Sequence, residues 1–223
     1  MPTTPRRPRT TTPLSRQRIV AAAMALADRH GVDELSMRKL ATDLGCEVMS
    51  LYNHVANKDD LIDEMVELAA AEIAEGPPGL RWDEAARVIA VSAKESMVRH
   101  PWSGPLWAGR FPGPVRMRHM DSLLAALGRS RLPSGVVDLG FHAVSMHIEG
   151  YVQQALAFRQ GQQAMSAAAA QFLASEHASR FPHLLAHFEY HRLSDDDRDD
   201  FVLVLDLILD GLRRIGRREV RRG

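Results

Sequence analysis

The chain has a single cysteine, few aromatic residues and no long uninterrupted apolar run among its 223 residues. With only Cys46 available, an internal disulfide is excluded, and the composition fits a reducing compartment such as the cytoplasm. The densest apolar stretch, residues 201–212, is interrupted by Asp206 and Asp210, so no membrane-spanning helix is expected. The arginines near the N-terminus are followed by no apolar segment, which argues against a secretory signal.

Sequence motifs of the common enzyme classes are also missing. We find no glycine-rich phosphate loop, no Gly-x-Ser-x-Gly nucleophile turn and no His-Glu-x-x-His zinc motif. Cys46 lies beside the acidic Glu47 and is interpreted as a small packing residue rather than a redox sensor. We therefore expect no enzymatic activity and no cofactor, and we keep a helical enzyme only as an alternative.

Three histidines recur at helical spacing and raise the question of a metal. His183, His187 and His191 could place their imidazoles on one helical face. No cysteine accompanies them and no supporting carboxylate is evident in the sequence. A solvated or capping role is favoured, and no metal is expected.

The formal net charge is zero, from 28 basic and 28 acidic residues, but the charges are unevenly distributed. Residues 1–18 hold five arginines and no acidic residue, and residues 1–58 hold nine basic against five acidic residues. Local charge decides contact with a polyanion, so the N-terminal region is a candidate for binding nucleic acid. The six arginines of residues 213–222 may equally be solubilising. Residues 1–13, rich in Thr, Pro and Arg, are predicted to form a disordered basic arm.

Apolar spacing predicts four helices after this arm. The first ends at Gly31, and the second begins after Ser36 and ends at Gly45. A short helix continues through Val55, and Asn57 is expected to cap a fourth helix. No segment of the chain has the alternating pattern of a strand, so the predicted fold class is all-α.

Residues 76–79, Gly-Pro-Pro-Gly, break the helical pattern and predict a domain boundary, with one domain at 14–74 and a larger helical domain at 80–218. In the larger domain a long helix is predicted to follow the boundary, and residues 100–114 are predicted to be irregular because prolines and glycines recur in them. Further helices are predicted at about 114–128, 135–160 and 163–180, with a last one after residues 194–197.

The last predicted helix is apolar around most of its circumference. Such a helix is expected to be buried on nearly all sides rather than along a single stripe. It either runs through the centre of its domain or packs against its own domain and a second subunit. The second reading is favoured, and we expect a homodimer.

Two short helices joined by a glycine-containing turn, after a longer supporting helix, are typical of a helix-turn-helix. The second helix of such a unit lies in the major groove of DNA, where each base pair presents its own donors and acceptors. Leu51 and Val55 are predicted to hold this helix on its neighbours. The polar and aromatic residues around them are then available to DNA.

The same region resembles the DNA-binding domain of the TetR family of bacterial transcriptional repressors, closely over residues 14–74. The matching segments are Ser36-Met37-Arg38-Lys39-Leu40-Ala41, Leu44-Gly45, Ser50-Leu51-Tyr52-Asn53-His54-Val55 and Asn57-Lys58-Asp59-Asp60-Leu61. A looser resemblance to the tetracycline-repressor-like C-terminal domain covers His100-Pro101-Trp102, Gly113-Pro114, Gly150-Tyr151-Val152, Phe181-Pro182-His183-Leu184 and residues 205–212.

The resemblance implies roles for individual DNA-contacting residues. Tyr52, His54 and Lys58 match contacts to backbone phosphates. Arg38 matches a residue that can reach a base edge, where a guanine suits a guanidinium. The outward recognition positions are matched by Val48, Met49, Ser50 and Asn53. Val48 and Met49 are apolar, which departs from the family pattern and leaves them to read thymine methyl groups or to fill space.

The resemblance also implies that the larger domain is a sensor, in which a small molecule binds among helices and changes the separation of two DNA-binding heads. The expected partners are a palindromic double-stranded DNA operator, a small-molecule effector and a second copy of the chain. The candidate pocket residues are Trp102, Trp107, Met117, Met120, Phe141, His142, Met146, His147 and Tyr151. Their aromatic and thioether groups would suit a flat, mainly apolar effector. A DNA-binding dimer that responds to no effector is the alternative.

Overall fold

The computed structural model describes residues 13–175, 178–193 and 199–220. Every secondary-structure element among them is helical, so the predicted all-α class is confirmed. Residue contacts divide the chain into two compact units, Met1–Leu68 and Ala69–Gly223, and the division precedes the Gly-Pro-Pro-Gly break of the sequence. The predicted basic arm, residues 1–13, lies outside the described residues except for its last position.

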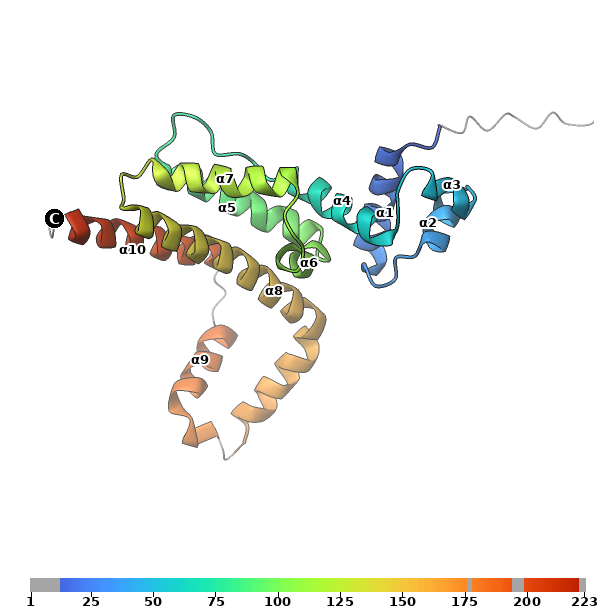
Figure 1. Cartoon of the computed structure of the whole chain (residues 1–223). Helices are drawn as coiled ribbons and strands as arrows, with labels where there is room; N and C mark the ends of the chain where they lie inside the picture. The colour runs from blue at the N-terminus through green and yellow to red at the C-terminus, as the bar shows by residue number, and fades with distance from the viewer. Residues whose placement is uncertain (1–12, 176–177, 194–198, 221–223) are drawn as a thin grey trace, which may run out of the picture. The chain divides into compact units, whose positions relative to one another are not determined.

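The first unit contains the three helices of a helix-turn-helix and most of a fourth (Figure 1). Ser15 and Ser36 each cap a helix with the side-chain hydroxyl, which accepts the backbone N–H three residues later at 3.2 Å. The four helices are α1 (Arg16–His30), α2 (Met37–Leu44), α3 (Val48–Tyr52) and α4 (Lys58–Ala70).

The turn between α2 and α3 depends on Gly45. Its φ of 67° and ψ of 36° lie in the left-handed region, where a side chain would be strained. The N–H of Gly45 donates to the carbonyl oxygen of Thr42 at 3.2 Å, and that of Cys46 to Ala41 at 3.0 Å. These bonds satisfy carbonyl groups at the end of α2 and turn the chain directly into α3.

The second unit is built from the remaining helices. Helices α5, α7, α8 and α10 pack on one another, while α9 lies along the C-terminal half of α8 (Figure 1). Their bounds are α5 (Trp82–Arg99), α6 (Ser103–Ala108), α7 (Pro114–Gly128), α8 (Ser134–Leu173), the 3-10 helix η1 (Ala178–Arg180), α9 (Pro182–Leu193) and α10 (Asp200–Val220).

Two helices of this unit differ from the sequence-based prediction. Residues 103–108 form α6 although the prolines there suggested irregular chain. Pro105 falls in the first turn, where an N–H has no helical partner and its absence removes no hydrogen bond. The predicted break near residue 161 is wrong, because α8 is continuous over 40 residues. A single glycine such as Gly161 weakens a helix by about 1 kcal/mol but does not end it.

The core of the second unit is rich in alanine on α5, which lets α7, α8 and α10 approach closely. The predicted inward face of α5 is confirmed, since its apolar residues from Ala85 to Met97 are buried. The core is completed by Leu123, Ala126 and Leu127 of α7, by Val136, Val144, Ile148 and Val152 of α8, and by Phe201, Leu205, Leu209 and Leu212 of α10.

Helix α10 is not buried on nearly all sides, so the reading that placed it at the centre of its domain is wrong. Phe201, Leu205 and Leu209 lie on the buried face, but Leu203 is exposed and Leu207 is 71% exposed in the single chain. The apolar residues that suggested all-round burial form an uncovered face instead. Within the described parts of the chain, no helix has the length and apolar character needed to cross a bilayer.

Candidate functional site: the helix-turn-helix surface and a pocket among α6, α7 and α8

The recognition helix α3 is anchored by two buried side chains. Leu51 is fully buried and Val55 is 1% exposed, as the sequence predicted. The helix ends at Tyr52, earlier than expected. The N–H groups of His54 and Val55 both donate to the carbonyl oxygen of Leu51, at 2.9 and 3.0 Å. Asn53 and His54 therefore lie in a tight turn after α3 rather than on its helical face.

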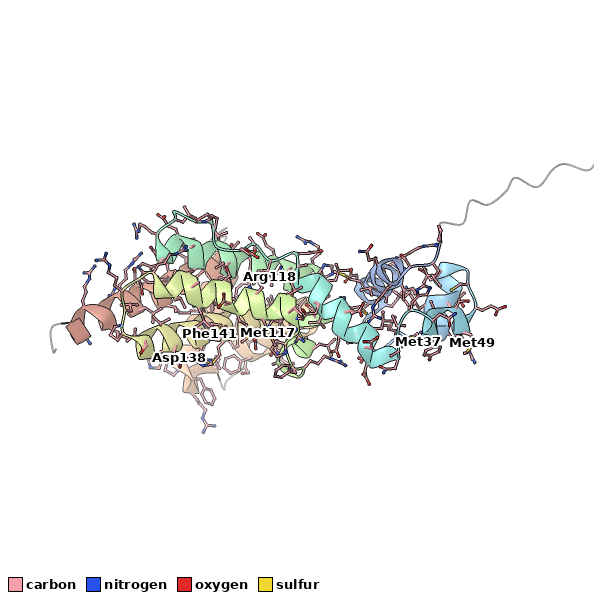
Figure 2. All side chains as sticks on the ribbon, turned by 45° about the horizontal axis from the view of Figure 1, so that its top comes forward. Met37, Met49, Met117, Arg118, Asp138 and Phe141 are labelled. Atoms are coloured by element: carbon pink, nitrogen blue, oxygen red, sulfur yellow. The ribbon has the colours of Figure 1, made fainter. Side chains whose placement is uncertain are left out.

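The predicted DNA-contacting side chains surround this anchor and reach solvent. Met49 is 70% exposed and points away from the ribbon (Figure 2), and Tyr52 is 43% exposed. Arg38 on α2 and Asn53 after α3 are exposed as well. The half-buried members of the set are Val48, Ser50, His54 and Lys58. One surface of the first unit thus carries side chains from α2, from α3 and its following turn, and from the start of α4.

The start of α4 is fixed by a reciprocal cap. The Oδ1 of Asn57 accepts the N–H of Asp60 at 2.8 Å, and the Asp60 carboxylate accepts the N–H of Ala56 at 3.1 Å. The predicted cap is therefore confirmed, and Lys58 is the first residue of α4. A cation at this position, beside a helix N-terminus, suits contact with a phosphate.

Arg16 orients this surface and was not singled out by sequence reasoning. Its guanidinium donates to the backbone carbonyl of His54 at 2.7 Å and forms ion pairs with Asp60 and Glu64 of α4. In sequence Arg16 is one of five N-terminal arginines and was counted only as part of a basic segment. Only its position at the start of α1 distinguishes it. It ties α1 to the turn after α3 and to α4.

Lys39 is engaged within the protein, next to Arg38 on α2. It forms an ion pair with Glu34, and this hydrogen bond from Lys39, with its charge, lowers the pKa of the Glu34 carboxyl from its ordinary value. Lys39 was interpreted as a solvated residue rather than a DNA contact. The ion pair leaves Arg38 as the exposed cation of α2.

In the second unit, α6, α7 and α8 enclose a cavity of about 350 Å³. This volume falls within the range of small-molecule sites in proteins. Five of the nine predicted pocket residues line it: Trp107, Met120, Phe141, His142 and Met146.

The other four predicted pocket residues lie elsewhere. Trp102 is buried beside His100, with ring centroids 5.9 Å apart, and Met117 is exposed on α7. His147 stacks on the Phe201 ring at 4.6 Å, and Tyr151 contacts the same ring edge-on at 5.1 Å. His147 and Tyr151 therefore face α10 and the core rather than the cavity.

Sequence reasoning missed the polar residues of this cavity. It also has Ala108, Arg110, Pro112, Arg116, His119, Ser145 and Glu149 in its lining. The signal was present on α8, where Phe141, Ser145 and Glu149 recur every four residues and so share a face. The sequence analysis selected large apolar groups and histidines, so a serine and a glutamate in the same line were passed over.

Arg116 shapes the cavity wall. It is 2% exposed, and its guanidinium donates to the carbonyl oxygens of Trp107, Arg110 and Phe111, at 3.3, 3.2 and 2.6 Å. Its charge also lies over the Trp107 ring, 5.9 Å from the centroid. Arg116 thereby holds the end of α6 and the following loop against α7.

Burial changes the titration of two cavity residues. It lowers the pKa of His119 from 6.5 to about 4, so the imidazole is neutral at physiological pH. The His119 ring also packs edge-on with Trp107, with centroids 5.7 Å apart. Burial raises the pKa of the Glu149 carboxyl above its ordinary value, and Glu149 forms no ion pair or hydrogen bond with the described part of the chain.

The end of α4 and the residues after it are held by α5 within the second unit. The Ser96 hydroxyl donates to the Ala69 carbonyl oxygen at 2.8 Å, and Glu72 pairs with Arg99 and with His100, whose Nε2 lies 3.2 Å away. His100 directly precedes α6, which contributes Trp107 to the cavity. The wall of the cavity and the end of α4 therefore contact the same short segment.

Among the described residues no group of three His, Cys, Asp or Glu side chains could hold a metal ion. The side chain of His191, one of the three histidines considered from the sequence, lies outside the described part.

A helix-turn-helix with an exposed recognition surface, joined to a helical unit with an internal cavity, defines a helix-turn-helix transcriptional regulator. A family model described as "Bacterial regulatory proteins, tetR family" matches residues 19–65, and one described as "Tetracyclin repressor-like, C-terminal domain" matches residues 76–215. The chain belongs to the TetR family of bacterial transcriptional regulators.

Individual relatives agree with this assignment. An HTH-type transcriptional regulator of Saccharopolyspora erythraea is 33% identical over 182 residues, covering 78% of this chain and 75% of the relative. The HTH-type transcriptional repressor DrrR1 of Streptomyces coeruleorubidus is 33% identical over 143 residues, covering 62% of this chain and 51% of the relative. ActR of Streptomyces coelicolor, a TetR family protein solved in complex with actinorhodin, has a TM-score of 0.73 at 29% identity, covering 92% of this chain and 99% of ActR.

These findings make the chain a DNA-binding transcriptional repressor of the TetR family. Its relatives are named as regulators and repressors, which is a non-enzymatic role.

Proposed function

We propose that this chain is a homodimeric repressor that binds a palindromic DNA operator and is released from it by a small molecule bound among α6, α7 and α8. Operator binding is assigned to residues 14–74, and effector binding and dimerisation to residues 80–218. A repressor that binds operator DNA works in the bacterial cytoplasm, on the nucleoid. The observation that carries the proposal is one chain with an anchored, outward-facing recognition helix and a separate cavity lined by aromatic groups.

On the DNA side, the proposed contacts divide by chemistry. Tyr52, His54 and Lys58 are assigned to phosphates, where they would set register without reading sequence. Arg38 is assigned to a base edge, with guanine as the best match for its paired N–H groups. The remaining outward residues face the bases: Val48, Met49, Ser50 and Asn53. The exposed thioether of Met49 suits a thymine methyl group.

Dimerisation is assigned to the uncovered apolar face of α10. Leu203, Val204 and Leu207 are all exposed in the single chain. Apolar side chains grouped on one helix face favour burial against a partner, and closed two-fold dimers are the commonest protein assemblies. A two-fold dimer would present two recognition helices to half-sites about 34–36 Å apart, one turn of B-DNA.

Release is assigned to the segment that the cavity wall and the end of α4 share. A molecule that enters the cavity contacts Trp107 on α6, and α6 follows directly after His100, the partner of Glu72. A change in α6 would therefore be felt at the end of α4, the helix that begins with Lys58. A modest change in the separation of two heads is enough to weaken binding to two fixed half-sites.

The proposal is tested by selecting bound duplexes from a random DNA pool and then screening small molecules for release. The selected duplex should be palindromic, and its binding should weaken steeply with salt. Combining Tyr52→Ala with Lys58→Ala should abolish this binding, while Lys39→Ala, whose side chain pairs with Glu34, should retain it. Unchanged binding in the double variant would contradict the assigned surface.

The alternative is a DNA-binding dimer that responds to no effector. Such a protein would retain its operator affinity against every molecule in the screen. The cavity favours the effector-responsive reading because its aromatic walls and three ionisable side chains, Arg116, His119 and Glu149, are unnecessary for a purely structural interface.

A further inference from the structure

The cavity has one acidic side chain in an otherwise aromatic and thioether lining. Glu149 follows Phe141 and Ser145 on one face of α8, with Met146 on the adjacent line of the same helix. Trp107 and Met120 contribute from α6 and α7. Flat rings pack favourably against such walls, through ring stacking and through contacts with methionine sulfur.

The carboxyl group of Glu149 has no partner of its own. It forms no hydrogen bond or ion pair with the described residues. Burial alone raises its pKa, with no contribution from a neighbouring cation. A partly buried carboxylate without a counter-charge is costly, and a cation placed beside it removes that cost.

The other ionisable groups of the cavity do not supply this cation. Arg116 is 2% exposed and directs its N–H groups at three backbone carbonyl oxygens. His119 is neutral at physiological pH because burial lowers its pKa to about 4. The nearest acidic group to His142 is Asp138, 3.8 Å from its Nε2. Arg110 lies on the wall opposite α8, and its charge could instead attract an anion, a case that the experiment below includes.

We propose that the effector of this protein is a flat aromatic molecule with a protonated amine, and that Glu149 holds the amine while Trp107, Met120 and Phe141 enclose the rings. The inference rests on the effector-binding role proposed above and adds the chemical class of the effector. In this arrangement the amine donates to the Glu149 carboxylate, the Ser145 hydroxyl is available to a polar ring substituent, and neutral His119 presents one donor and one acceptor.

The test uses three tricyclic probes of similar size and different charge: proflavine as the cation, acridone as the neutral ring and anthracene carboxylate as the anion. Binding to the full-length protein without DNA is followed by probe anisotropy and by quenching of tryptophan fluorescence. Proflavine is expected to bind at least about tenfold more tightly than acridone, and anthracene carboxylate most weakly, because a charge-assisted hydrogen bond is added to the same ring contacts.

The matched variants are Glu149→Gln, which keeps the shape of the side chain, and Glu95→Gln, which changes an exposed glutamate on α5 far from the cavity lining. Glu149→Gln should weaken proflavine binding about tenfold and leave acridone binding unchanged. Glu95→Gln should change neither. Thermal unfolding of both variants verifies folding, and the comparison of the three probes on the unaltered protein depends on no variant.

Several outcomes would overturn the inference: equal affinity for proflavine and acridone, preference for anthracene carboxylate, no binding of any probe, or a Glu149→Gln variant that binds proflavine normally. The proposed function is separable from it. If acridone binds and releases the operator as well as proflavine does, an effector-responsive repressor stands and the cationic class falls. If the operator survives every molecule of a broad screen, effector release itself falls.

Discussion

The Nε2 of His100 lies 3.2 Å from a carboxylate oxygen of Glu72, and this contact joins the residues after α4 to the residues before α6. Glu72 also pairs with Arg99 at the end of α5. His100 is buried, with 4% of its surface exposed, so the contact is protected from solvent. The pair is the shortest described connection between the wall of the effector cavity and the helix that begins at the DNA-binding surface.

Breaking this pair should uncouple the two functions without abolishing either. In Glu72→Gln, operator binding in the absence of effector should persist, while the effector found by the release screen should reduce operator affinity less, by about 0.5–2 kcal/mol of coupling energy. The measurement is a titration of labelled operator with and without saturating effector. Glu75→Gln, an exposed glutamate in the same segment, is the control. Equal coupling in the two variants would show that the pair transmits nothing.

The start of α4 predicts a specific salt dependence. If Lys58 contacts one phosphate, Lys58→Ala should lower the slope of log affinity against log salt concentration by about 1 per half-site, because one fewer counterion is released. Met49→Ala should change affinity and base preference but leave this slope alone, because its exposed side chain has no charge. The slopes come from anisotropy titrations at several salt concentrations. A steeper or unaltered slope for Lys58→Ala would remove the phosphate assignment.

The uncovered face of α10 predicts how the dimer can be broken. Leu207, 71% exposed in the single chain, should be buried in the dimer, so Leu207→Glu should give monomers in sedimentation experiments and lose operator binding. Leu184→Glu changes an exposed leucine of α9 and serves as the comparison. A Leu207→Glu variant that remains dimeric would move the interface to another face.

Burial of His119 predicts a loss of stability in acid. The folded protein keeps its pKa at about 4, whereas the unfolded chain has a value near 6.5, so below pH 6.5 the unfolded state takes up a proton that the folded state does not. This contribution to stability is full above pH 6.5 and declines by about 3 kcal/mol as the pH falls to about 4.

The decline is measured by denaturant unfolding across this pH range. His119→Phe, which keeps a ring beside Trp107, should remove the part of the slope that belongs to His119. An identical pH dependence in His119→Phe would show that the imidazole is not held neutral by the fold. Glu149 lies in the same cavity with a pKa shifted in the opposite direction, so the comparison is made on the difference between the two proteins.

The helix-turn-helix was predictable because its signals are local. Ser36 and Asn57 cap the helices they precede, and Gly45 turns the chain where a left-handed residue is required. Leu51 and Val55 are buried where the spacing placed them. Each of these depends on residues within a few positions of one another, which a single sequence displays directly.

The cavity was only partly predictable because its members meet through packing. Trp107, His119 and Glu149 lie on three helices, and no spacing rule brings them together. His147 and Tyr151 have the same composition as pocket residues, but the rotation of α8 turns them toward Phe201. The continuity of α8 also escaped prediction, because the weak helix propensity of one glycine is outweighed by the rest of the helix.

By itself, the sequence determined that this protein is helical, where its recognition helix begins and ends within a few residues, and which side chains that helix leaves to DNA. Only the tertiary structure decided that Glu149 shares a cavity with Trp107, and that α10 leaves an apolar face uncovered. The physical reason is the range of the interactions. Caps and turns act over three or four residues, whereas a cavity or an open face exists only after helices distant in sequence have packed.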